Sequence, residues 1–303
     1  MYARYAVKVH QWQYLRDSLL KTQEENTEEN FERNLDSISG EGEMMKDTVV
    51  KYLVKPEDAG LKNPVLVEGL PGIGHVGKLV AEHLIKELKA KKIIEIYSPH
   101  FPPQVIVNED GTITMVRNEI YAWKSDGRAP DLLILVGDYQ SVTNEGHYEL
   151  TGIYIDIAKK FGVKRIYTLG GYGIGKFVEE PFVLGAANSP SLVEEMISYG
   201  VEFRNSEPGG GIIGASGLLL GFAQEEGIEA VCLMGVTSGY MVDPKSAQAV
   251  LRVLMKALNL DVRTEELERR AEEMERIISR LKETESQLLT PQYKRDEDLR
   301  YFG

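Results

Sequence analysis

The segment with the clearest chemical potential is a glycine-rich loop. It follows the apolar run at residues 65–67, opens a stretch with helical periodicity, and contains Gly72, Gly74, Gly77 and Lys78. The three glycines match G-x-G-x-x-G, a pattern that lets backbone amides approach the pyrophosphate of a dinucleotide at a helix N-terminus. The same residues nearly match G-x-x-x-x-G-K-[ST], the phosphate loop of nucleotide hydrolases. The loop therefore suggests nucleotide chemistry.

Each nucleotide pattern is incomplete. Leu79 stands where the phosphate loop has the hydroxyl that binds magnesium. Glu95 lies close to the spacing of a ribose-binding acid but falls inside a strand pattern. Asp138 follows the apolar run that begins at Leu132, and this run resembles the second motif of nucleotide hydrolases, an apolar strand that ends in an acid. We favour a tight strand-to-helix turn whose glycines serve packing. A nucleotide-dependent enzyme, an ATP-using ligase or an NAD-dependent one, is the alternative.

Other catalytic and metal-binding patterns are missing from the sequence. The five histidines show no ligand spacing, Ser216 lacks the full nucleophile-elbow pattern, and Cys232 is the only cysteine. We expect no enzyme activity, no cofactor and no metal. Two further glycine clusters, at residues 170–175 and 209–211, fit close backbone packing or a subunit contact better than a ligand cradle.

Charge and hydropathy exclude two classes of partner. The 303 residues carry 35 Lys and Arg against 47 Asp and Glu, a formal net charge of −12. An acidic chain is a poor match for a phosphate backbone, so we expect no nucleic acid. No apolar run approaches the length of a membrane span, and the first residues show no secretion signal. We expect a cytoplasmic protein.

Short apolar runs alternate with helical periods from about residue 48 to 260. Unbroken runs such as Leu132–Val136 are typical of strands buried on both faces, in a mainly parallel sheet covered by helices. The turn at 108–111 predicts an antiparallel hairpin within residues 105–123. We therefore expect an α/β fold with an α/β core at 45–262, preceded by a flexible extension at 1–44.

The C-terminal region predicts a helix and a tail. Apolar residues at heptad spacing suggest an oligomerisation helix at 263–290, with a seam formed by Leu267, Ala271, Met274, Ile278 and Leu281. Pro291 ends this helix, and residues 291–303 form a polar tail with an aromatic end.

Six separated segments together resemble the proteasome assembly chaperone family, in particular its archaeal members. They are EGLPGIGHVGKLVAEHLI, YSPHFPPQV, DLLILVGDYQS, TLGGYGIGK, EPGGGIIGASGLLLGFAQEEGI and GVTSGYMVDPKSA. The resemblance covers most of the chain after Met45. It implies a three-layer α/β/α core similar to purine nucleoside phosphorylases. It also implies a non-enzymatic homo-oligomer, a tetramer or pentamer, that binds the α-subunit ring of the proteasome core particle.

The resemblance further implies that the chain end is a docking motif. Family members carry a hydrophobic–tyrosine–any motif, and the matching positions are Tyr301, Phe302 and Gly303. Phe302 replaces the tyrosine, which removes one hydrogen bond, a net effect of about 1 kcal/mol. The aromatic ring and the terminal carboxylate remain. An assembly chaperone and an ATP-independent activator both fit this pattern.

Overall fold

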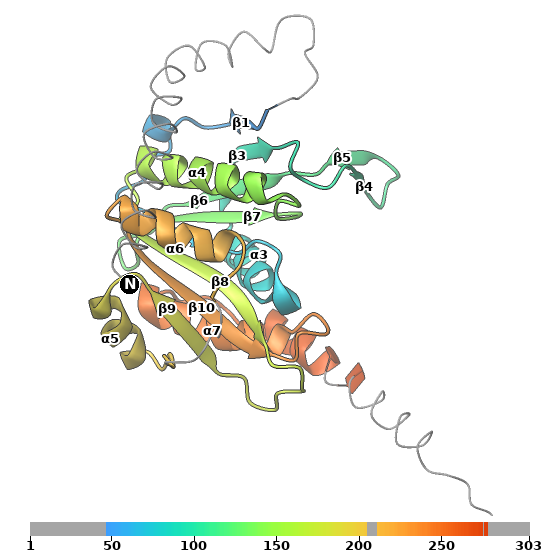
Figure 1. The fold of residues 1–303 in the computed structure, drawn as a ribbon, viewed down its shortest axis with the longest axis vertical. Helices are drawn as coiled ribbons and strands as arrows, with labels where there is room; N and C mark the ends of the chain where they lie inside the picture. The colour runs from blue at the N-terminus through green and yellow to red at the C-terminus, as the bar shows by residue number, and fades with distance from the viewer. Residues whose placement is uncertain (1–46, 205–210, 275, 278–303) are drawn as a thin grey trace, which may run out of the picture. The chain divides into compact units, whose positions relative to one another are not determined.

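The computed structural model describes residues 47–204, 211–274, 276 and 277. Their centre is one eight-stranded sheet of order β1-β3-β6-β7-β2-β8-β10-β9 (Figure 1). The strands are β1 (Val49–Tyr52), β2 (Val65–Glu68), β3 (Lys91–Tyr97), β6 (Asn118–Trp123), β7 (Leu132–Gly137), β8 (Arg165–Gly173), β9 (Val183–Ala187) and β10 (Glu229–Thr237).

The middle of this sheet is parallel, as the apolar runs predicted. Strands β7, β2, β8 and β10 pair in parallel, and antiparallel pairs flank them on both sides. Within the described chain, five of the eight strands run in one direction. Every residue of β7 is buried, because helices cover both faces of the central strands. The carboxyl ends of the parallel strands therefore share one edge of the sheet.

Helices form the two outer layers (Figure 1). Helices α3 (Val76–Leu88) and α7 (Pro244–Leu258) pack on one face, α4 (Asn144–Lys160) and α6 (Ala215–Glu225) on the other, and α5 (Pro190–Ser198) beside β9. Short 3-10 turns occur at η1 (Pro56–Asp58) and η2 (Ile73–His75). The start of α4 is set by Thr143, whose hydroxyl accepts a hydrogen bond from the Gly146 amide. The predicted three-layer α/β/α core is confirmed. None of the described helices is long and apolar enough to cross a membrane.

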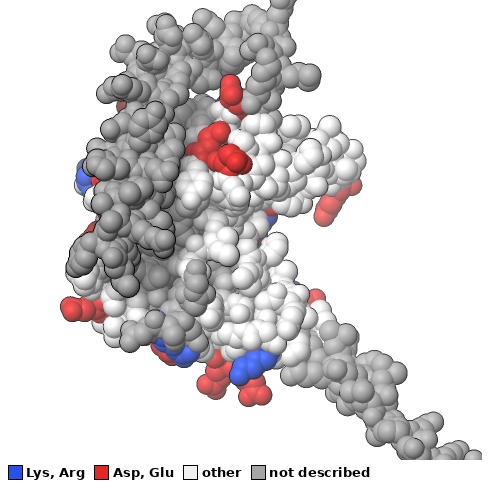
Figure 2. Space-filling model, in the orientation of Figure 1, with Lys and Arg blue, Asp and Glu red and all other residues white. Residues whose placement is uncertain are grey.

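The predicted hairpin forms an arm outside the main sheet. Strands β4 (Val105–Val107) and β5 (Ile113–Met115) pair only with each other, in antiparallel register. The pairs Val105–Met115 and Val107–Ile113 lie on one face and are 41–69% exposed, while Ile106 and Thr114 occupy the other face. Acidic side chains mark the tip of the arm (Figure 2).

The C-terminal helix begins on the core. Residues 265–274 are helical, Leu267 and Ala271 are buried, and Leu267 belongs to the core formed with α3 and α7. Two of the five predicted seam residues thus contact their own chain. Met274 is half-buried, whereas Ile278 and Leu281, the extension at 1–44 and the tail at 291–303 lie outside the described residues.

Candidate functional site

The glycine-rich loop connects β2 to α3 and brings the backbone at the start of α3 close to the backbone of β8 and of the residue that follows β2. A β-carbon on Gly77 would lie 2.2 Å from the carbonyl oxygen of Leu169 in β8, and one on Gly69 would lie 2.4 Å from the carbonyl oxygen of Gly77. Gly74 has a φ of 63°, in the left-handed region that favours glycine. The glycines therefore have a packing role, since they allow α3 to sit directly on the sheet.

A buried acid precedes the loop. Glu68 ends β2 and is fully buried; its Oε1 accepts from the Leu70 amide at 2.9 Å and its Oε2 from the Ser216 hydroxyl at 2.9 Å. Burial raises the pKa of Glu68 to about 7, although these hydrogen bonds lower it. The carboxyl group joins the loop to the first turn of α6.

Lys78 and Asp138, both singled out by the nucleotide patterns, line one cavity of about 370 Å³. It lies between α3, β6 and the inner face of the β4–β5 arm, with Asn108 and Thr114 on the arm side. Lys78 forms an ion pair with Glu82 at 3.7 Å, and Asp138 accepts a hydrogen bond from the Arg117 amide at 3.1 Å. Both charged groups thus already have partners within the chain.

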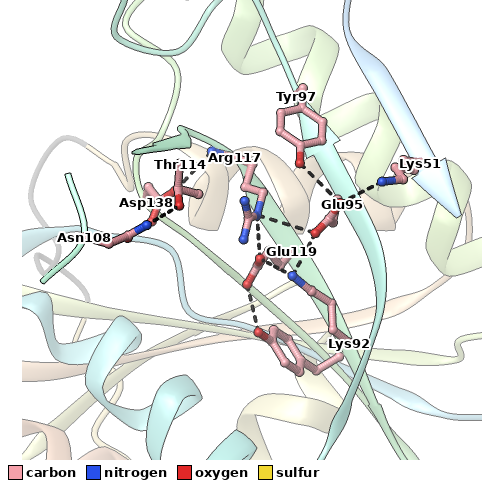
Figure 3. A network of polar contacts seen from close by, with 10 residues as sticks. Lys51, Lys92, Glu95, Tyr97, Asn108, Thr114, Arg117, Glu119 and Asp138 are labelled. Atoms are coloured by element: carbon pink, nitrogen blue, oxygen red, sulfur yellow. Dashed lines mark hydrogen bonds and ion pairs between the residues drawn. The ribbon is translucent and has the colours of Figure 1, made fainter. Parts of the chain in front are cut away.

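An ion-pair network continues from this cavity across β6 and β3 (Figure 3). Arg117 Nε lies 2.6 Å from Glu119 Oε1, and Lys92 Nζ lies 2.8 Å from Glu95 Oε1 and 3.0 Å from Glu119 Oε1. Lys51 of β1 reaches Glu95 at 3.5 Å. Three cations therefore surround two carboxylates next to the cavity beside α3.

The electrostatics of the network match this geometry. The hydrogen bond from Lys92 lowers the pKa of Glu95 despite some burial. Burial raises the pKa of Glu119, but hydrogen bonds from Arg117 and Lys92 outweigh it and the pKa is lowered. Glu95, considered above for a ribose, is thus held by ion pairs inside β3. Each carboxylate of the network is therefore paired with at least two cations of its own chain.

Removing one cation should cost stability. We expect Arg117→Gln to lower the free energy of unfolding by roughly 1 to 2 kcal/mol, because Glu119 and Glu95 lose a charged donor while only partly exposed. Urea denaturation at low salt measures the change. The control is Arg128→Gln, whose pair with Asp126 is solvent-exposed and should contribute nothing measurable. Equal stability of the two variants would contradict a structural role for the network.

Sequence reasoning missed Glu68 and the partners of Glu95. The signal available for the network was the period-two alternation along β6, where Glu119 and Tyr121 alternate with buried Asn118 and Ile120. Tyr301, Phe302 and Gly303 lie outside the described residues, so the docking motif stays a prediction. Within the described part of the chain, no cluster of three or more His, Cys, Asp or Glu side chains could hold a metal.

Comparison with known proteins places these features in context. The model of the PAC2 family matches residues 66–282. An uncharacterized protein of Methanocaldococcus jannaschii is 43% identical over 246 residues, which cover 80% of this chain and 93% of that protein.

Two solved structures from Pyrococcus furiosus resemble the fold. PbaB, described as an archaeal proteasome activator, has a TM-score of 0.73 and 41% identity, over 78% of this chain and all of that one. PbaA, described as an archaeal homolog of proteasome-assembly chaperone, has a TM-score of 0.64 and 29% identity, over 79% of this chain and 94% of that one.

Proposed function

This chain belongs to the PAC2 family, and on that premise we propose that it is a non-enzymatic, cytoplasmic proteasome-binding factor. It docks on the α-subunit ring of the core particle without ATP. The observation that carries the proposal is the 41% identity to PbaB across the whole length of that chain. The identity to PbaA is lower, 29%. This difference favours a proteasome activator over an assembly chaperone.

The contact with the ring is assigned to Tyr301, Phe302 and Gly303. These residues combine an aromatic pair with the terminal carboxylate, a group that a cationic or amide-lined pocket recognises. Residues 291–303 can span at most about 45 Å when extended, so the motif can reach a pocket well away from the core domain. A homo-oligomer presents several such tails, which raises their effective concentration at a ring with repeated sites.

The packing role of the glycines supports a non-enzymatic protein. Gly69 and Gly77 are required by contacts between β2, α3 and β8, and the charges beside the loop are paired within the chain. The pattern that suggested nucleotide chemistry therefore has a structural explanation that needs no ligand.

Deletion of Tyr301–Gly303 tests the docking motif. We expect it to weaken binding to a purified core particle at least about tenfold, because each tail loses its aromatic burial and its original terminus. Surface plasmon resonance measures the affinity, and peptide hydrolysis without ATP should rise with the full chain but not with the deletion variant. Tyr293→Ala is the control, since it removes an aromatic ring from the same segment but leaves the motif intact. Undiminished binding after the deletion would refute the assignment.

Phe302 stands where the family motif has tyrosine, and restoring that tyrosine should tighten binding, whereas the deletion should weaken it. Phe302→Tyr restores the hydroxyl of the family motif and should tighten binding about fivefold, the equivalent of one net hydrogen bond of about 1 kcal/mol. The same binding assay measures it. Weaker binding of this variant would mean that the pocket is not the one that the family motif enters.

A further inference from the structure

The cavity beside α3 borders the place where open α/β sheets bind small molecules. Strands β2 and β7 are parallel neighbours, and the helices that follow them, α3 and α4, cover opposite faces of the sheet. The crevice at the carboxyl ends of two such strands is the usual ligand position in these sheets. Lys78 lies in the first turn of α3 and Asp138 directly follows β7, and both line the cavity of about 370 Å³.

Two cations at the cavity have hydrogen-bond donors to spare. Lys78 Nζ lies 3.7 Å from Glu82, too far for a hydrogen bond, and it donates to no other described residue. Arg117 donates to Glu119 through Nε, whereas its two terminal nitrogens donate to no acceptor in the described part of the chain. The side chains of Lys78 and Arg117 are only 21% and 22% exposed. Because both charges are partly withdrawn from water, a carboxylate that reached them would bind more strongly than at an open surface.

Asp138 supplies the opposite charge. It is half-buried, its Oδ2 accepts from the Arg117 amide at 3.1 Å, and no cation of the described residues forms an ion pair with it. Figure 3 shows Asp138, Asn108 and Thr114 on one side of Arg117, away from Glu95. A protonated amine at this side would give Asp138 the cation that it lacks, with the amide and hydroxyl oxygens of the arm as further acceptors.

The charges at the cavity decide between classes of ligand. Glu82, Glu119 and Asp138 line it together with only two cations, so a phosphate group would face more negative than positive charge. A simple carboxylate would leave Asp138 without a cation, and a simple amine would leave the donors of Lys78 and Arg117 unused. A ligand that carries both a carboxylate and an ammonium group satisfies both sides.

The remaining wall of the cavity is apolar. Ile85 of α3, Ile106 of the arm and Val136 of β7 line it; Val136 is buried and the other two are half-buried. These side chains offer apolar surface to an aliphatic group. The volume is at the small end of the range of ligand pockets, about 300 to 1,000 Å³. It suits a single amino acid better than a nucleotide.

We propose that the cavity between α3, β6 and the β4–β5 arm binds a free α-amino acid with an aliphatic side chain. The carboxylate accepts from Lys78 and Arg117, the ammonium group donates to Asp138, and the side chain lies against Ile85 and Ile106. Because Ile106 belongs to the arm and Ile85 to α3, the ligand joins the arm to the core. This binding does not depend on the proposed contact with the proteasome.

The experiment is isothermal titration calorimetry of the full chain with L-leucine and two analogues. Isocaproate is leucine without its amino group, and isoamylamine is leucine without its carboxylate. L-Leucine should bind at least about tenfold more tightly than either analogue, because each analogue lacks one charge-assisted interaction. Equal affinity for isocaproate would mean an anion site, and equal affinity for isoamylamine a cation site. Either result, or no binding of L-leucine at millimolar concentration, would overturn the proposal.

Two variants assign the ligand groups to residues. Asp138→Asn keeps an acceptor for the Arg117 amide but removes the charge, so it should weaken L-leucine about tenfold and should not weaken isocaproate. Lys78→Gln should weaken L-leucine and isocaproate but leave isoamylamine unchanged. The matched controls, Asp126→Asn and Lys86→Gln, alter exposed charges away from the cavity and should bind like the wild type. Circular dichroism verifies folding. If both cavity variants bound L-leucine like their controls, the ligand would lie elsewhere and the proposal would be wrong.

Discussion

Replacing Gly77 with alanine should lower the free energy of unfolding by about 3 kcal/mol. The added β-carbon would lie 2.2 Å from the carbonyl oxygen and 2.8 Å from the carbonyl carbon of Leu169. These are backbone atoms of β8, in the centre of the sheet, so they cannot rotate away as a side chain would. Helix α3 would have to shift outward from the core that it forms with α7. Urea denaturation followed by circular dichroism measures the loss.

Gly221→Ala is the matched control for this prediction. Gly221 lies in α6, is exposed, and has no atom within 4 Å of the position that a β-carbon would take. Alanine there should stabilise the protein by about 0.5 to 1 kcal/mol, because it reduces the conformational freedom of the unfolded chain and favours helix. If Gly77→Ala proved as stable as the wild type, the packing explanation of the loop would fail and its nucleotide-like pattern would need another cause.

Glu68 should make the protein less stable as the pH rises from about 5 to 8. Burial raises the pKa of this carboxyl to about 7 in the folded state, against 4.5 as its ordinary value. Between these two values the folded chain holds a proton that the unfolded chain has released, so the stabilisation is complete below pH 4.5 and is lost as the pH rises through 7. The loss should amount to roughly 3 kcal/mol.

Glu68→Gln isolates this effect. The amide keeps the shape of the protonated carboxyl group and cannot ionise, so the variant should lack the decline between pH 5 and 8. The measurement is the free energy of unfolding of both proteins at several pH values, taken as a difference so that other titrating groups cancel. Glu95 and Glu119 act in the opposite sense: their pKa values are lowered, so their stabilisation is lost as the pH falls below 4.5. An identical slope in wild type and variant would contradict the assignment to Glu68.

The layers of this fold could be predicted from local sequence patterns. The run at 132–136 is apolar at every position, and its residues form a strand buried on both faces. The turn at 108–111 predicted the antiparallel arm β4–β5, because tight turns require a few specific residue types. The spacing of apolar residues and the residue types of a turn are both set within a few consecutive positions, so both can be recognised in a single sequence.

Only the tertiary structure decided which polar residues meet. Glu95 has a spacing suited to a ribose-binding acid, yet the register of β3 against β1 places it opposite Lys51, and Arg117 reaches it from the segment before β6. Glu68 finds its partner Ser216 148 residues away. The pairs of Glu95 with Lys51 and of Glu68 with Ser216 have no local signal, because they depend on how segments far apart in the sequence are brought together.

The same division holds for the surfaces. The sequence by itself identified the family resemblance, the α/β class and the aromatic end at Tyr301–Gly303. The exposed side chains of Ile73, Ile174 and Tyr240 come to one edge of the sheet only because β2, β8 and β10 are parallel neighbours, since these residues are far apart in the chain. Short-range physics specifies the elements, whereas a surface built from several loops exists only once the parallel strands have been aligned.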